Sequence, residues 1–210
     1  VGSEMCIRDS AHTLAGNPNY EVISGNVDFN DENLLDMDPS ERSLSGLFMA
    51  FQYPIELPGV TNASYLKQIV NIHRKHRGEK PIEAGDFLKL LKEKSVRLNI
   101  SMDMHSRFVN AGFSGGEKKK NEVLQLDLLN PNLVIMDETD SGLDVDALKS
   151  TSEAVNQLRS SNRSFIIITH YLRLLEYIEP DFVHVFQDGS IIESGDKSLA
   201  NRIDKQGYAY

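Results

Sequence analysis

Two stretches of the chain are almost continuously apolar, NLVIMDE at 132–138 and SFIIITH at 164–170. A strand with one solvated face alternates apolar and polar residues, whereas a strand covered on both faces is apolar throughout. Both stretches therefore predict buried strands of a parallel sheet. Between them, Leu148, Val155 and Leu158 recur at helical spacing. This order predicts a strand, helix, strand crossover.

Further strands are predicted on either side of this unit. GNVDF at 25–29 and GLFMAFQ at 46–52 precede it, and DFVHVFQ at 181–187 follows it. The last of these leads through DGS, a tight hairpin turn, into IIESG at 191–195. His184 lies inside this strand, so we expect it to be a packed core histidine.

The middle of the chain has a different pattern. Residues 62–77 and 83–98 are amphipathic in a helical period, and no strand pattern separates them. The turn-rich segments YPIELPGV and NAGFSGG border this region. We therefore predict a helical subdomain at 59–111 inserted into a core of 12–58 and 112–210, with residues 1–11 set apart.

Composition narrows the class of protein. The 210 residues are 40% hydrophobic and carry a formal charge of −9, which is typical of a soluble globular protein and argues against general affinity for nucleic acid or anionic membrane. No apolar run approaches the ~18 residues that a membrane crossing requires. A cytoplasmic setting is therefore expected. Cys6 is the only cysteine, so the chain cannot form an internal disulfide or a cysteine-ligated cluster.

The segment FSGGEKKK begins a predicted helix at Ser114. Ser114 followed by Glu117 is the pattern of a capping box, in which both side chains bond free amides at a helix start. A second interpretation uses the same geometry, because Gly115 and Gly116 leave those amides open to an anion at the positive end of the helix. The three lysines that follow are predicted to form the solvated flank of the helix.

Two acids, Asp137 and Glu138, end the apolar stretch at 132–138. Open α/β sheets hold their ligands at the carboxyl ends of their strands. An aspartate there can hold Mg²⁺, and an adjacent carboxylate can polarise water for phosphoryl transfer. The alternative is that the two acids merely end the strand. His170 ends the next strand and Gln52 ends another apolar run.

In chain order, five features resemble the motifs of the ATP-binding-cassette ATPases: Gln52, FSGGE, LVIMDE, SGLD and His170. They are similar to the glutamine loop, signature loop, Walker B strand, D-loop and switch histidine of that family. The resemblance implies an α/β fold of the P-loop NTPase type, with a mainly parallel sheet flanked by helices and an inserted helical subdomain. It also implies an ATPase that uses ATP and Mg²⁺.

The resemblance implies a role for each matching residue. Asp137 and Gln52 would hold Mg²⁺, and Glu138 and His170 would be catalytic, as general base and γ-phosphate contact. Gln52 would also link the nucleotide state to a partner surface. Two chains of this family sandwich ATP head to tail, so ATP would favour a closed self-dimer. Nucleotide would further be bound by Gln52, Glu117 and Asp144 and, across the dimer, by Ser114, Gly115 and Gly116.

Longer stretches, among them GFSGGEKKKNEVLQ and DETDSGLDVDALK, resemble the Suf-type ATPases of iron–sulfur cluster assembly from about Thr13 onward. Transporter cassettes typically have glutamine after the signature glycines and proline after the Walker B glutamate, where this chain has Glu117 and Thr139. An assembly ATPase is therefore favoured, and the nucleotide-binding subunit of a transporter is the alternative. The implied partners are soluble scaffold proteins like SufB and SufD, with no nucleic acid and no membrane.

The phosphate-loop pattern G-x-x-x-x-G-K-S/T does not occur in the 210 residues. By the resemblance it should end just before HTLAGNPNYEV, where the chain instead has VGSEMCIRDS. We expect residues 1–11 to be a lead-in foreign to the family, with the first strands and the phosphate loop missing. The 210 residues by themselves would then bind ATP weakly and hydrolyse it negligibly. A natural variant N-terminus is the alternative.

Overall fold

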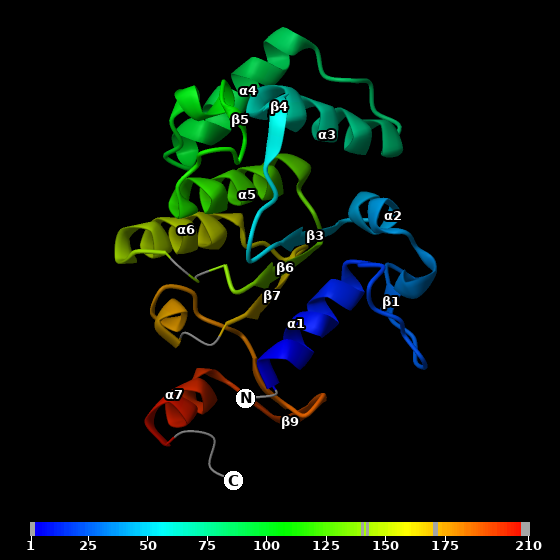
Figure 1. Ribbon diagram of the computed structural model, residues 1–210, viewed down its shortest axis with the longest axis vertical. Coiled ribbons are helices and arrows are strands. Elements are labelled where there is room, and N and C mark those ends of the chain that lie inside the picture. The colour runs from blue at the N-terminus through cyan, green and yellow to red at the C-terminus, as the bar shows by residue number, and fades with distance from the viewer. Residues whose placement is uncertain (1–2, 140, 142, 170–171, 207–210) are drawn as a thin grey trace.

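A parallel sheet lies at the centre of the computed structural model, which describes residues 3–139, 141, 143–169 and 172–206 (Figure 1). Both neighbouring pairs of strands are parallel, and the middle strand is the apolar stretch that ends in the two acids. The α/β fold is therefore as the sequence predicts. The strand order is β3 (Leu47–Ala50), β6 (Leu133–Asp137), β7 (Ser164–Ile168).

Both faces of this sheet are covered, which explains why β6 is apolar throughout. Val134 and Met136 belong to the main core with α5 (Gly115–Leu129) and α6 (Val145–Leu158), whereas Ile135 belongs to a second core with α1 (Ser3–Leu14). The prediction of a buried strand is confirmed for β6. It is wrong for β7, where Ile166 is 42% exposed, because β7 pairs only with β6 among the described residues.

The crossover between β6 and β7 is α6, as the helical spacing predicts. Its cap is Asp144, whose carboxylate accepts a hydrogen bond of 2.7 Å from the Ala147 amide. α6 packs beside α5 over one face of the sheet (Figure 1). A Cβ placed on Gly116 of α5 would lie 3.2 Å from the Ala147 Cβ of α6, so the first turns of the two helices pack against each other.

The inserted region contains α3 (Asn62–His76) and α4 (Ala84–Arg97), so both predicted helices are confirmed. A short antiparallel pair at its base, β4 (Leu57–Thr61) with β5 (Phe108–Val109), was not predicted. Leu66 of α3 and Leu91 of α4 are fully buried in the same core as Leu124 of α5. Packing therefore ties this region directly to α5. Its status as a separate subdomain at 59–111 stays a prediction.

The segment after α1 forms a small hairpin, β1 (Asp28–Phe29) with β2 (Glu32–Asn33), followed by η1 (Leu34–Asp36) and α2 (Pro39–Leu44). The prediction of a strand over 25–29 is therefore wrong in extent. Asn30 and Asp31, at the turn, both have positive φ, of 53° and 65°. This is the conformation of a two-residue hairpin turn, and it folds the strand back on β2.

The C-terminal part contains η3 (Leu172–Glu176), β8 (Val183–Gln187), β9 (Ser190–Gly195) and α7 (Lys197–Gln206). β8 and β9 form the predicted hairpin. His184 is exposed, with Nδ1 2.8 Å from Ser194 Oγ, so the prediction of a core histidine is wrong. Alternation along β8 buries Val185 and turns His184 to the other face. Among the described residues, no helix combines the length and apolarity needed to cross a membrane.

Candidate nucleotide site

Asp137 and Glu138 form a buried carboxylate pair at the end of β6, with 1% and 4% of their surfaces exposed. Glu138 has a φ of +42°, which is unusual for a residue with a side chain. Its amide donates a hydrogen bond of 2.9 Å to the Ile168 carbonyl, which holds this conformation against β7. Backbone strain of this kind costs about 1–3 kcal/mol and clusters at functional sites.

Gln52 reaches this pair from the neighbouring strand. β3 ends at Ala50, opposite Met136 in β6, so the residues that follow β3 lie beside the end of β6. Gln52 Nε2 donates a hydrogen bond of 2.5 Å to Glu138 Oε2. The structure therefore brings together Gln52, Asp137 and Glu138, three of the residues that the sequence singled out.

Positive charge faces the carboxylate pair from α1. Arg8 Nη2 lies 2.7 Å from Glu138 Oε1, and Arg8 Nε lies 3.7 Å from Asp137 Oδ2. His12 Nε2 lies 3.8 Å from the same Asp137 oxygen. Burial raises the pKa of Asp137, and the nearby charge of Arg8 offsets part of that rise. The charged form of Asp137 is therefore stabilised by the cation beside it.

The chemistry of the pair fits a divalent cation. Within the described part of the chain, neither side-chain oxygen of Asp137 accepts a hydrogen bond, although both are buried. Mg²⁺ takes oxygen ligands, usually one or two carboxylates with waters and phosphate oxygens. Asp137 has the free lone pairs for such a ligand, and the Arg8 guanidinium now lies against the same carboxylates.

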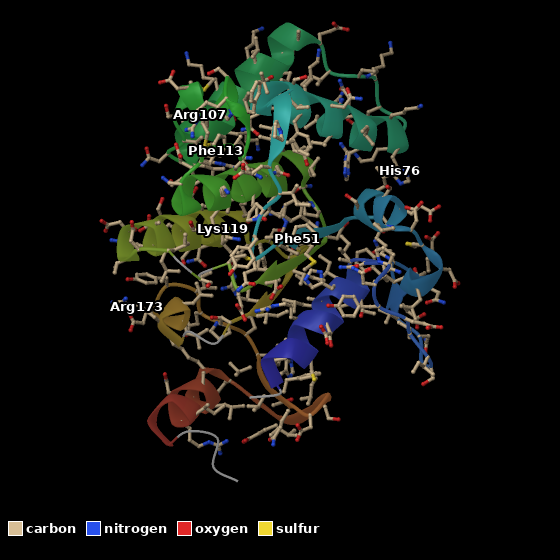
Figure 2. The ribbon with its side chains drawn as sticks, in the orientation of Figure 1. Phe51, His76, Arg107, Phe113, Lys119 and Arg173 are labelled. Carbon is tan, nitrogen blue, oxygen red and sulfur yellow. The ribbon has the colours of Figure 1, made fainter. Side chains whose placement is uncertain are left out.

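A buried ion pair holds the backbone just before Gln52 (Figure 2). Lys119 Nζ donates to the Phe51 carbonyl and lies 3.0 Å from Glu122 Oε2, while Glu122 Oε1 accepts the Phe51 amide at 2.9 Å. The prediction of a solvated lysine flank is wrong for Lys119, which is 4% exposed. Its helical spacing to Val123 and Leu126, both buried, is the signal that could have identified it.

The signature turn, Ser114–Glu117, is a complete capping box, so the first interpretation of this segment is confirmed. The Ser114 amide donates to Glu117 Oε2 at 2.8 Å, and the Glu117 amide donates to Ser114 Oγ at 3.2 Å. The Ser114 backbone amide lowers the pKa of Glu117, and a hydrogen bond from Arg107 adds to this effect. Anion binding by the turn, the second interpretation, stays a prediction.

Gly116 brings the signature turn against α6. A Cβ placed on Gly116 would lie 3.2 Å from the Ala147 Cβ. Ala147 also donates its amide to Asp144, so Asp144 caps the helix that the turn packs on. The predicted residues thus form two clusters, one with the carboxylate pair and Gln52, the other with the turn and Asp144. His170 lies outside the described residues.

Two curated relatives are similar to this chain over nearly all of its length. It is 50% identical over 198 residues to the probable ATP-dependent transporter SufC of Escherichia coli K12, covering 94% of this chain and 80% of that protein. It is also 50% identical over 198 residues to the probable ATP-dependent transporter ycf16 of Cyanophora paradoxa, covering 93% and 75%. No family model matches the chain.

Solved structures give the fold independently. A dimeric, post-hydrolysis structure of the ATP-binding cassette MJ0796 has a TM-score of 0.74 at 13% identity, over 91% of this chain and 80% of that one. A nucleotide-free cassette from an ABC transporter has a TM-score of 0.71 at 20% identity, over 97% and 83%. The identity to SufC and ycf16 and this shared fold together show that the chain belongs to the ATP-binding-cassette ATPases, in the group of SufC and ycf16.

Proposed function

We propose that this protein is the ATPase subunit that powers iron–sulfur cluster assembly on a soluble scaffold complex in the cytoplasm. The observation that carries the proposal is the hydrogen bond between Gln52 and Glu138, because it joins a surface loop to the buried acids. The 50% identity to SufC supports the assembly role. A transporter cassette is the second candidate, since both relatives are named as probable ATP-dependent transporters.

The buried acids would carry the hydrolytic step. Asp137, with Gln52, would hold Mg²⁺, which supplies Lewis-acid stabilisation of charge on the transferred phosphoryl group. Glu138 would accept the proton of the attacking water, and the Gln52 amide would keep the Glu138 carboxylate oriented. His170 would contact the γ-phosphate.

The second cluster would act on nucleotide held by another copy of the chain. Gly115 and Gly116 begin α5 at its positive end, where amides attract anions. The solved MJ0796 cassette is dimeric, which supports a self-dimer here. We infer a head-to-tail dimer in which ATP is bound between the two copies by Ser114, Gly115, Gly116, Glu117 and Asp144.

The scaffold would bind the loop that follows Gln52. Tyr53 is 80% exposed and Ile55 is 72% exposed, so this loop presents large apolar side chains to solvent. Exposed apolar groups beside a reactive site favour protein partners. Binding there would move the Gln52 backbone, and with it the contact to Glu138.

Co-purification of the full-length protein from its own cells tests this function. We expect soluble scaffold proteins like SufB and SufD to copurify, and Ile55→Ser to weaken their retention. Ile23→Ser is the matched control, because Ile23 is 95% exposed and lies in a different segment. Retention of an integral membrane partner in place of a scaffold would support the transporter function instead.

A further inference from the structure

Arg107 lies at the base of the inserted region and contacts the signature turn (Figure 2). Its Nη1 donates to Glu117 Oε1 at 2.9 Å, and its Nη2 donates to the Gly112 carbonyl at 2.5 Å. Its Cζ lies 4.4 Å from the centre of the Phe113 ring. The guanidinium therefore engages the turn and the two residues that precede it through a charge, a hydrogen bond and a stacking contact.

Glu117 is the residue through which Arg107 acts on the turn. One carboxylate oxygen of Glu117 accepts the Ser114 amide, and the other accepts Arg107. Because the carboxylate is planar, holding one oxygen directs the other. Arg107 thus fixes the orientation of the capping box from outside the helix.

The backbone of Arg107 is tied to the inserted region. Its carbonyl accepts a hydrogen bond of 2.9 Å from the amide of Asn62, the first residue of α3. The next residue, Phe108, pairs with Thr61 between β5 and β4 and is 47% exposed. The backbone of Arg107 therefore contacts the base of the inserted region, and its side chain contacts the signature turn.

We propose that Arg107 is a positioning residue for the signature turn, and that it controls ATP hydrolysis at the nucleotide held by the partner copy. This inference rests on the proposed head-to-tail dimer. Lysine cannot replace Arg107, because one ammonium group cannot bond two acceptors in a fixed fork and also stack on a ring. The effect of Arg107 should therefore appear in the other subunit's turnover.

Mixed dimers of the full-length protein test the proposal. Glu138→Gln in one subunit leaves a single active site, built from the other subunit's Glu138 and the first subunit's signature turn. Arg107→Ala in the Glu138→Gln subunit should lower turnover about 10- to 100-fold, the cost of a small displacement in a reacting site. Arg107→Ala in the other subunit should leave turnover unchanged, and Arg107→Lys should behave like Arg107→Ala.

Equal losses for both placements, or no loss for either, would overturn the proposal. A parent dimer without ATP turnover would instead contradict the proposed function. Amide exchange then still decides the role of Arg107. Arg107→Ala should speed exchange of the Glu117 amide but not of the Ala147 amide, and unchanged exchange at Glu117 would refute the positioning role.

Discussion

The signature turn begins α5, and the carboxylate pair ends β6. The polar groups of the two features are satisfied in opposite ways. In the turn, Ser114 and Glu117 bond each other's amides, and Ser114 is exposed. In the pair, Asp137 is 1% exposed and neither of its oxygens accepts a hydrogen bond among the described residues. The turn satisfies its own amides, and Arg107 holds the second oxygen of Glu117, whereas the buried pair needs a cation.

This difference separates two ways of building a nucleotide site. A turn whose amides are bonded by its own side chains keeps its shape on a surface. It can therefore contact a ligand that is bound to another chain. Buried carboxylates are costly unless positive charge or hydrogen bonds compensate them. The pair therefore depends on its own neighbours, Arg8 at one oxygen and Gln52 at another.

The largest effect is expected at the pair itself. In the full-length protein, Glu138→Gln should slow ATP hydrolysis by about 10²–10⁴-fold, the usual loss when a general base is removed. ATP binding should persist, because the amide keeps the size of the side chain. Steady-state turnover and equilibrium nucleotide binding measure the two quantities. Undiminished turnover would remove Glu138 from the catalytic role.

Next in size is the buried ion pair that holds the glutamine loop. Lys119→Met leaves Glu122 buried without its cation, and should lower the free energy of unfolding by about 3–5 kcal/mol in urea titrations. Lys118→Met is the control, because Lys118 pairs with the exposed Glu56 and such pairs contribute about 0–1 kcal/mol. Equal losses in both variants would show that burial does not distinguish the two lysines.

Removing Arg8, the cation beside the carboxylate pair, should make the stability of the protein depend on Mg²⁺. In Arg8→Ala, Mg²⁺ at ten times its dissociation constant should raise the free energy of unfolding by about 1.4 kcal/mol, as expected for a ligand of the folded state. The parent chain should respond less, because Arg8 lies against the same oxygens. Thermal melts with and without Mg²⁺ measure the difference. A second change, Asp137→Asn, should abolish the response.

A single substitution in the signature turn should lower the free energy of unfolding by less than the changes above. Ser114→Ala removes the hydroxyl that accepts the Glu117 amide and should lower the free energy of unfolding by about 1 kcal/mol, as other lost helix caps do. Ser161→Ala, at an exposed loop serine, is the matched control. A loss well above that of a helix cap would mean that the Ser114 hydroxyl does more than cap α5.

The smallest effect is expected from acid. Hydrogen bonds from Ser114 and Arg107 lower the pKa of Glu117 from its ordinary 4.5. The folded state therefore binds this proton less readily than the unfolded state. The resulting stability is present above 4.5 and is lost as the pH falls through the lowered value. Below pH 4.5, the melting temperature of Glu117→Gln should fall less with decreasing pH than that of the unsubstituted protein.

Several contacts of the site could not be predicted from the residues alone. The helical spacing of Lys119 could indicate that it turns inward, but not that it pairs with Glu122 while Lys118 pairs with Glu56. β7 has the same apolar run as β6, yet only β6 has a strand on each side in the described part of the chain. Arg107 stood out in no motif, because its role depends on contacts with Glu117 and Phe113.

What the sequence alone determined is local. The capping box at Ser114 and Glu117 and the cap at Asp144 join residues three apart, so backbone geometry and side-chain length suffice to predict them. Only the tertiary structure decided the contact between Gln52 and Glu138, which lie 86 residues apart, because it requires β3 and β6 to be parallel neighbours. Long-range contacts depend on how elements pack, and no short segment of sequence encodes that.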